Sequence, residues 1–367
     1  MNNYSSIYIH IPFCHNICSY CDFCKMFYNE ELVNKYLDSL EDEISTYEIP
    51  DNIKTIYIGG GTPSSLNNSQ LERLFSITDN INLSNNYEFT FEINPEDINE
   101  ELLIILKNHR VNRISIGIET INSKFYKLLN RSNDITSLKN KIDLCKKYFT
   151  NINIDLMYAF PNETIKDLEK DLEFFISLDI PHISIYSLII EENTVLYNDK
   201  TKNISEEIDS EMYYFIINYL KERNYIHYEI SNFCKEGYQS IHNSTYWNND
   251  KYLGIGLGAS GYIDNFRYSN TRSINKYLDG NYILDKEYIT KNNSMEYEMI
   301  LGLRKIEGVN KKSFFDKYHI QLEDKFDIME MVNNKSLVNK GDYIYIPEDK
   351  LYISNSILVN FIGEDDE

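Results

Sequence analysis

The sequence predicts a mixed α/β protein built on a partial (β/α)6 barrel, with a small winged-helix-like α+β domain toward its C-terminal end. Two patterns lead to this prediction. Short β-rich runs alternate with longer segments of helical spacing through the first half of the chain, and two helical patterns followed by an alternating segment end the second half. Strands that alternate with helices indicate βαβ units and therefore a parallel sheet.

The elements of the first half are placed by their residue ranges. The expected strands are Ile7–Ile11, Lys54–Ile58, Tyr87–Ile93, Asn112–Ile118, Asn151–Tyr158 and His182–Ile190, and the expected helices are Leu32–Ile44, Leu71–Ile81, Glu101–Asn108 and Leu168–Leu178. We expect the strands to be apolar on both faces, as in Ile152, Ile154 and Leu156 with Met157, which is typical of a sheet covered by helices. A flavodoxin-like open sheet is the alternative, because periodicity does not reveal whether a barrel closes.

The alternation of strands and helices stops near residue 195. One amphipathic helix is expected at Glu206–Glu222, a loop-rich stretch at Tyr228–Asn275, two further helices at Met295–Leu303 and Lys311–Tyr318, and a hairpin made of Tyr343–Ile346 and Leu351–Ile353. This pattern predicts a barrel core at residues 1–235, a linking region that packs on the core at 236–290, and a C-terminal domain at 291–367.

Composition and charge exclude several classes of partner. The chain of 367 residues has 57 Asp and Glu against 36 Lys and Arg, which gives a net charge of −21. Such a surface repels phosphate backbones and anionic lipid, so nucleic acid is not an expected partner. The absence of any apolar run of about 18 residues argues against an integral membrane segment. The N-terminal residues lack the features of a secretion signal, so we expect a cytoplasmic protein, either a monomer or a homodimer.

Three cysteines follow the first expected strand, on the kind of loop that carries barrel active sites. They are Cys14, Cys18 and Cys21, out of six cysteines in the chain. Clustered cysteines in a cytosolic protein indicate metal or redox chemistry rather than disulfides. Three thiolates can hold three irons of a 4Fe–4S cluster and leave the fourth iron open. A zinc site that uses Cys24 or His15 as its fourth ligand is the alternative.

The segment around these cysteines resembles a known superfamily. Residues Ile7–Cys14, followed by Cys18–Phe23, are similar to the radical S-adenosylmethionine (SAM) enzymes, and within them to the branch of oxygen-independent coproporphyrinogen III oxidases and HemW-like heme chaperones. The resemblance implies a 4Fe–4S cluster bound by Cys14, Cys18 and Cys21. It also implies that SAM chelates the open iron and that reduction of its sulfonium yields a 5′-deoxyadenosyl radical.

The resemblance extends to motifs after the later strands. It implies that the glycine-rich loop at 59–64 holds the amino end of SAM, that Glu92 binds the ribose, and that Arg131 pairs with the SAM carboxylate. Glu119 stands where this branch usually has glutamine, which changes the charge and removes two donors at that contact. The complete set of SAM residues implied in this way is Tyr8, Tyr20, Gly60, Gly61, Thr62, Glu92, Glu119, Arg131 and Asp155.

A second motif, His242–Trp247, resembles the His-Asn-x-x-Tyr-Trp signature of the heme chaperones. A neutral imidazole can ligate heme iron, and aromatic rings offer flat apolar surface to a porphyrin. The resemblance therefore implies heme contacts at His242, Asn243, Tyr246 and Trp247. We expect a structural role for His10 and His182.

These motifs together imply a heme chaperone that carries a 4Fe–4S cluster and SAM, binds heme as cargo, and delivers it to a respiratory hemoprotein. An electron donor is a further implied partner, and the sequence identifies neither the donor nor the client. Oxidases of this branch carry a Cys-x-Cys pair, whereas here Cys24 lies three positions after Cys21. Coproporphyrinogen dehydrogenase-like activity is therefore expected to be absent. The alternatives are an oxidase that oxidatively decarboxylates porphyrinogen propionates and a radical SAM methyltransferase.

Overall fold

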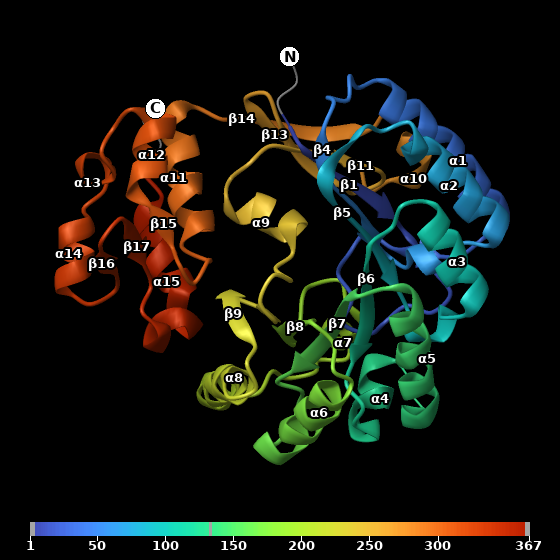
Figure 1. Cartoon of the computed structure of the whole chain (residues 1–367), viewed down its shortest axis with the longest axis horizontal. Helices are drawn as coiled ribbons and strands as arrows, with labels where there is room; N and C mark the ends of the chain where they lie inside the picture. Colours follow the sequence, from blue (N-terminus) through green and yellow to red (C-terminus); the bar gives the residue numbers. More distant parts are fainter. Residues whose placement is uncertain (1–3, 132–133, 364–367) are drawn as a thin grey trace.

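The structure, a computed structural model, describes residues 4–131 and 134–363. Its core is a series of parallel strands that alternate with helices along the chain, as the sequence predicts (Figure 1). In spatial order these strands are β1 (Ser6–Ile11), β4 (Ile53–Gly60), β5 (Leu83–Ile93), β6 (Arg113–Glu119), β7 (Asn151–Tyr158) and β8 (His182–Ser187). Each strand pairs in parallel with the next one in this order.

Helices cover the outer side of these strands (Figure 1). The long ones are α1 (Glu30–Ser45), α2 (Asn68–Asp79), α3 (Glu100–Asn108), α5 (Ile135–Tyr148), α6 (Ile165–Ser177) and α8 (Glu206–Lys221), and two short ones, α4 (Ser123–Leu129) and α7 (Val195–Asn198), lie in the loops after β6 and β8. Several begin at a side chain that accepts a backbone N–H bond, such as Asn29, Asn67 and Asn99. Such caps fix where a helix starts.

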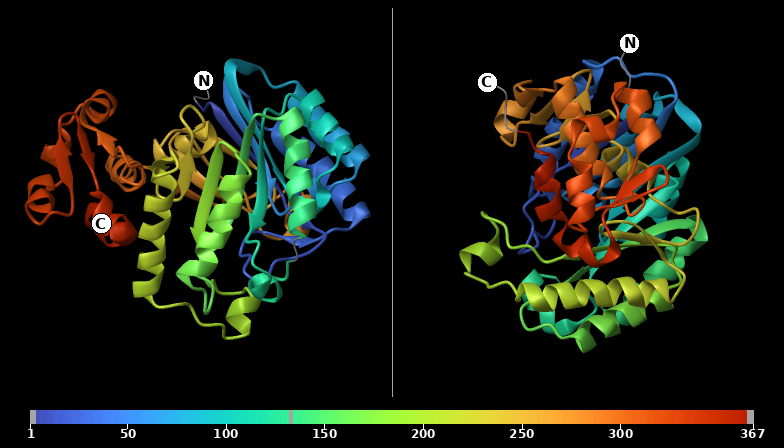
Figure 2. Two further views of the ribbon diagram at one scale, coloured as in Figure 1. Left: turned by 60° about the horizontal axis from the view of Figure 1, so that its bottom comes forward. Right: turned by 90° about the vertical axis from the view of Figure 1, so that its left-hand side faces the viewer.

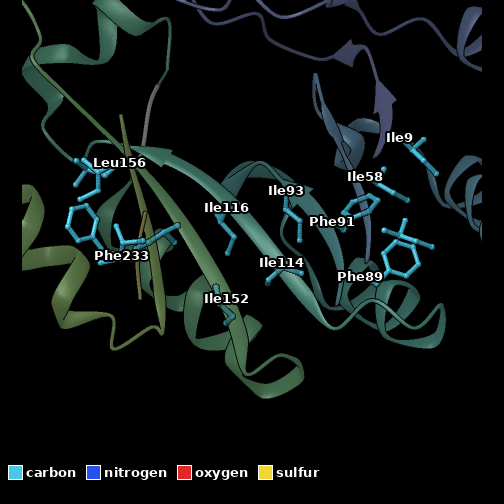
Figure 3. Close-up of a cluster of buried hydrophobic side chains, with 14 of the residues drawn as sticks. Ile9, Ile58, Phe89, Phe91, Ile93, Ile114, Ile116, Ile152, Leu156 and Phe233 are labelled. Atoms are coloured by element: carbon cyan, nitrogen blue, oxygen red, sulfur yellow. The ribbon is translucent and has the colours of Figure 1, made fainter. Parts of the chain in front are cut away.

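The two faces of the core strands differ in chemistry. In β6, Ile114 and Ile116 belong to the hydrophobic core under the helices (Figure 3), whereas Arg113, Ser115 and Gly117 line the interior of the barrel. The prediction of strands apolar on both faces is therefore wrong. Side chains of a strand alternate between its faces, and here the inner face is polar and lines a pocket.

Residues 226–288 add strands to both sides of this core, so the prediction of a loop-rich stretch over 228–275 is wrong. The added elements are β9 (Ile226–Glu229) and β10 (Asn232–Cys234) beside β8, and β11 (Tyr252–Ile255), β12 (Ser260–Ile263), β13 (Phe266–Asn270), α10 (Ile274–Leu278) and β14 (Ile283–Tyr288) beyond β1. Within the described part of the chain, one twelve-stranded sheet runs from β14 to β9, and these two edge strands do not pair with each other. The barrel is thus partial, as predicted.

Helix α9 (Ile241–Trp247) packs against the beginnings of the core strands. The carboxylate of Glu88, which pairs with Thr55 of β4, accepts hydrogen bonds from the N–H groups of Ile241 and His242 at 3.0 and 2.9 Å. Thr245 is bonded to Ser6, the first residue of β1, at 3.0 Å. The helix therefore covers the end of the barrel opposite to the loops that follow the strands.

The last part of the chain forms a separate α+β unit at one side of the barrel (Figure 2), and it lies beside β9 (Figure 1). Its elements are α11 (Lys291–Gly302), β15 (Val309–Asn310), α12 (Lys311–Tyr318), α13 (Leu322–Lys325), α14 (Ile328–Asn333), β16 (Val338–Lys340), β17 (Tyr343–Tyr345) and α15 (Ser354–Leu358). The predicted hairpin partner of β17 is wrong: β17 pairs with β15 and β16, while Leu351–Ile353 lies in a 3-10 helix that begins after Pro347. Proline has no N–H to continue the strand pairing. None of the described helices has the length and hydrophobicity needed to cross a bilayer.

Candidate functional site

A pocket of about 480 Å³ lies at the C-terminal ends of the parallel strands. Its wall consists of the loops that follow β1, β4, β5, β6 and β8, together with inward side chains of the strands. The predicted site residues that line it are Cys14, Cys18, Tyr20, Cys21, Gly60, Gly61, Thr62, Glu92, Glu119, Arg131, Asp155 and Asn243. Tyr8, His242, Tyr246 and Trp247 do not line it. The structure thus gathers most of the predicted residues, which are far apart in sequence, around one cavity.

The cysteine loop begins in β2 (Phe13–Cys14) and returns through β3 (Met26–Phe27), which pairs with it in parallel. Two donors face its sulfurs. The Thr62 hydroxyl donates to Cys14 Sγ at 3.6 Å, and Arg131 Nε–H donates to Cys18 Sγ at 3.1 Å. Burial raises the pKa of Cys14 to about 11, and the bond from Thr62 opposes this rise. Both donors favour the thiolate, which is the form that binds metal.

The arrangement of the thiols distinguishes between the metal groups that the sequence allows. Among residues 4–131 and 134–363, no three His, Cys, Asp or Glu side chains converge on a single metal ion. Cys14, Cys18 and Cys21 share the pocket wall, whereas Cys24 and His15 do not line it. The arrangement fits a group that takes one thiolate at each of three irons, as a 4Fe–4S cluster does.

The glycine loop after β4 comes too close to its neighbours for any side chain. A Cβ atom on Gly60, whose φ is +117°, would lie 2.4 Å from the His10 ring, and one on Gly61 would lie 2.8 Å from backbone. His10 is itself fixed, since its Nδ1 accepts from the Tyr8 hydroxyl at 2.9 Å and its Nε2–H donates to the Cys24 carbonyl at 2.7 Å. The bare backbone of the loop is thus held open to a ligand. Tyr8 is connected to this loop through its hydrogen bond to His10, and it does not line the pocket.

Two carboxyl groups, Glu92 and Glu119, line the pocket. Glu92 accepts from the Tyr57 hydroxyl at 2.6 Å and from Gly60 N–H at 2.9 Å, and burial raises its pKa to about 7. Glu119 lies 3.5 Å from Arg131, and burial raises its pKa to about 7 against the pull of that guanidinium. Both acids therefore exchange protons near neutral pH and can accept or donate hydrogen bonds to a polar ligand.

The sequence analysis missed the residues at the floor of the pocket. These are inward side chains of the strands: Tyr57, Arg113, Ser115, Asn153, Ser184 and Tyr186. Asn153 Nδ2–H donates to Asp155 Oδ1 at 2.8 Å, and burial raises the pKa of that acid. The signal that could have found them is the polar residue at every second position of each β-rich run.

The His-Asn-x-x-Tyr-Trp motif is mostly enclosed. His242 is 1% exposed, and its Nδ1 and Nε2 are hydrogen-bonded to Thr55 and Tyr246, each at 2.7 Å. Burial lowers the pKa of His242 to about 3, so the imidazole is neutral at physiological pH. Of the four residues, Asn243 alone reaches the pocket, and Trp247 lies at the contact between α9 and α11. As placed, His242 has no ring nitrogen open to a heme iron.

Comparison with known proteins extends these observations. The profile of the Radical SAM superfamily matches residues 8–175. The chain is 38% identical to the heme chaperone HemW of Lactococcus lactis over 98% of each chain, and 38% identical to that of Bacillus subtilis over 98% of this chain and 99% of the other. It is 29% identical to the heme chaperone HemW of Escherichia coli, over 98% of each chain.

A solved structure has the same fold. Coproporphyrinogen III oxidase (HemN) from Escherichia coli superimposes with a TM-score of 0.85 over 97% of this chain and 89% of that chain, at 21% identity. Membership in the superfamily implies a 4Fe–4S cluster and SAM as cofactors, and the thiols and the glycine loop described above suit them. The chain belongs to the HemW family of the radical SAM superfamily.

Proposed function

We propose that this protein is a heme chaperone, which binds heme and passes it to a respiratory hemoprotein. One observation carries the proposal: heme chaperones of the HemW type match this chain at 38% identity over 98% of its length, and they do so with no large insertion or missing part. The pocket at the end of the barrel is the proposed working site.

The cofactor roles follow from the contacts of the pocket. Cys14, Cys18 and Cys21 would hold three irons of the cluster, with Thr62 and Arg131 as donors to two of the sulfurs. The remaining residues proposed to hold SAM are Tyr20, Gly60, Gly61, Glu92, Glu119 and Asp155 in the pocket wall and Tyr8 beneath it. When bound, the cluster supplies an electron and SAM supplies a reducible sulfonium group.

The rim of the pocket supports a flat apolar ligand. Phe23 and Ile189 line the pocket and are 62% and 64% exposed. Exposed apolar side chains grouped at a cavity mouth mark a binding surface. Such rings and branched chains can cover the face of a porphyrin. We propose that the heme cargo enters the pocket at this rim and extends toward Asn243, which lines the pocket from α9 at the opposite end of the barrel.

Iron ligation by His242 is part of the proposal and carries a structural requirement. The Nε2 atom must lose its bond to the Tyr246 hydroxyl before it can reach a metal. Because α9 carries both residues, the motif must open locally for heme to bind there. Tyr246→Phe removes the competing hydroxyl and leaves the ring in place.

We also propose that the chain divides into a barrel core at 1–235, a region packing on it at 236–290 and a C-terminal domain at 291–367. The support is that α11 and the elements after it surround their own sheet of β15, β17 and β16. Their backbone bonds to the barrel include Ile230 N–H to Arg304 O at 3.0 Å and Ile306 N–H to Tyr228 O at 3.1 Å.

The experiment uses full-length protein whose cluster has been reconstituted without oxygen. Hemin is titrated and followed by its absorption, and coproporphyrinogen III is incubated separately with SAM and a reductant. We expect stoichiometric hemin binding that His242→Ala weakens and Tyr246→Phe retains or tightens, with no protoporphyrinogen formed. Rapid protoporphyrinogen formation would assign the protein to the oxidases instead, and unchanged binding in His242→Ala would remove the imidazole from the heme site.

A further inference from the structure

A buried arginine at the floor of the pocket has almost no partners. Arg113, the first residue of β6, is 2% exposed and its side chain lines the pocket. Its Nη1–H donates to Thr90 Oγ1 at 3.5 Å, the outer limit of a hydrogen bond, and its Nε has no partner. Within residues 4–131 and 134–363 the guanidinium forms no ion pair. A guanidinium has five N–H donors, and leaving them unpaired away from water is costly.

The second arginine of the pocket differs in this respect. Arg131 donates to the Gly117 carbonyl at 2.9 Å and to Cys18 Sγ at 3.1 Å, and it lies 3.5 Å from Glu119. Arg113 and Gly117 are four residues apart in one strand, so their backbones are separated by ~13 Å. The pocket thus has one arginine at its upper end that is already paired and one at its floor that forms no ion pair.

The side chains around Arg113 are mostly neutral hydrogen-bonding groups. Ser115, Asn153 and Ser184 line the same floor, and they are bonded to one another through the Asn153 amide at 2.7 and 3.0 Å. Asp155 is the nearest acid of this network, and its oxygens accept from Asn153 and Ser115 rather than from the guanidinium. The charge of Arg113 opposes the rise in pKa that burial causes at Asp155 and Glu92, yet neither carboxyl group forms an ion pair with it. The floor therefore combines a guanidinium without an ion pair with fixed hydroxyl and amide groups, which is a setting for an anion.

We propose that Arg113 is an anchor for a carboxylate group of the ligand that occupies this pocket. The inference rests on the proposed function, because heme carries propionate groups. The amino-acid carboxylate of SAM is already assigned to Arg131 at the upper end of the pocket, so a propionate is the expected partner of Arg113. A planar guanidinium can donate two parallel hydrogen bonds to one carboxylate. Such a partner would satisfy the N–H groups of Arg113 that are not bonded to Thr90. Depth in the pocket makes the contact selective, since a ligand must enter fully to reach it.

The test compares acid and neutral forms of each ligand in wild-type protein and in Arg113→Gln. Hemin is paired with hemin dimethyl ester, and SAM with decarboxylated SAM, and dissociation constants are measured with the cluster reconstituted. Arg267→Gln is the matched control. Arg267 also has an Nε without a partner, but it lies 4.5 and 4.2 Å from the rings of Tyr262 and Tyr297, outside the pocket.

We expect Arg113→Gln to weaken the binding of hemin by roughly tenfold to a hundredfold and to leave the binding of hemin dimethyl ester unchanged. A loss confined to the hemin pair identifies a propionate, and a loss confined to the SAM pair identifies the amino-acid carboxylate. Equal effects on acid and neutral forms, or no effect on either pair, would overturn the inference.

Two further measurements keep the test decisive. Arg113→Lys retains the positive charge but lacks the planar guanidinium that forms two parallel bonds. It should fold even if Arg113→Gln does not, and it should recover part of the affinity for the acid form of the ligand alone. Thermal unfolding of both variants separates loss of fold from loss of a contact. Wild-type protein that binds no hemin would refute the proposed function, while the SAM pair would still test Arg113.

Discussion

The buried carboxyl group of Glu92 makes the stability of the unliganded protein depend on pH. Its pKa rises from 4.5 to about 7 in the fold, because burial disfavours the charged form. The folded state therefore holds the proton more tightly than the unfolded state does. The stability that protonated Glu92 contributes is complete below pH 4.5 and is lost as the pH rises through 7.

The substitution Glu92→Gln removes this titration with almost no change in size. The full pKa difference corresponds to roughly 3 kcal/mol, which we reduce to about 2 because the side chain faces the water of the pocket. Glutamine keeps one acceptor oxygen, so it can serve either Tyr57 or Gly60 but not both, at a cost of about 1 kcal/mol. The variant should thus be less stable than wild type by about 1 kcal/mol at pH 5 and more stable by a similar amount at pH 8.

The assay is urea unfolding of the cluster-free protein at both pH values, with the free energy of unfolding extrapolated to water. Glu173→Gln is the control, since Glu173 is exposed on the outer helix α6. It should change stability by the same small amount at pH 5 and pH 8. If Glu92→Gln lowers stability equally at the two pH values, Glu92 is ionised throughout and the reasoning from its burial fails.

Three further predictions concern the loops and helix around the pocket. Cys18→Ala should abolish the EPR signal of the reduced cluster, whereas Cys24→Ala, outside the pocket wall, should retain it. Gly60→Ala should abolish SAM binding in equilibrium dialysis, because its Cβ atom would lie 2.4 Å from the His10 ring. The control is Gly237→Ala, which has open space around it and a φ of +84°. It should bind SAM normally and lose only about 1 kcal/mol of stability in thermal unfolding. Glu88→Gln should lower the free energy of unfolding by roughly 1–3 kcal/mol, because its carboxylate accepts two N–H groups at the start of α9; an unchanged value would show that the cap is dispensable.

Much of the barrel could be predicted because its signals are local. Each expected core strand overlaps an observed one, and β7 has the expected bounds, Asn151–Tyr158. Helices α1, α2, α3 and α6 also lie where the spacing places them. The errors came from elements with weak local signals. Strands β11 to β14 are short and rich in Gly, Ser and charged residues, and they are stable only as additions to an existing sheet edge.

The amino-acid sequence alone determined the chemistry of the loops, because the three thiols, the glycine turn and the acids that follow the strands occur in that order along the chain. Tertiary structure decided what lies beside what. It turned the polar face of every core strand inward, placed Arg113 without an ion pair at the pocket floor, and enclosed His242 between Thr55 and Tyr246. The physical reason is that strand periodicity specifies two faces, while only the curvature and order of the sheet select the one that faces a ligand.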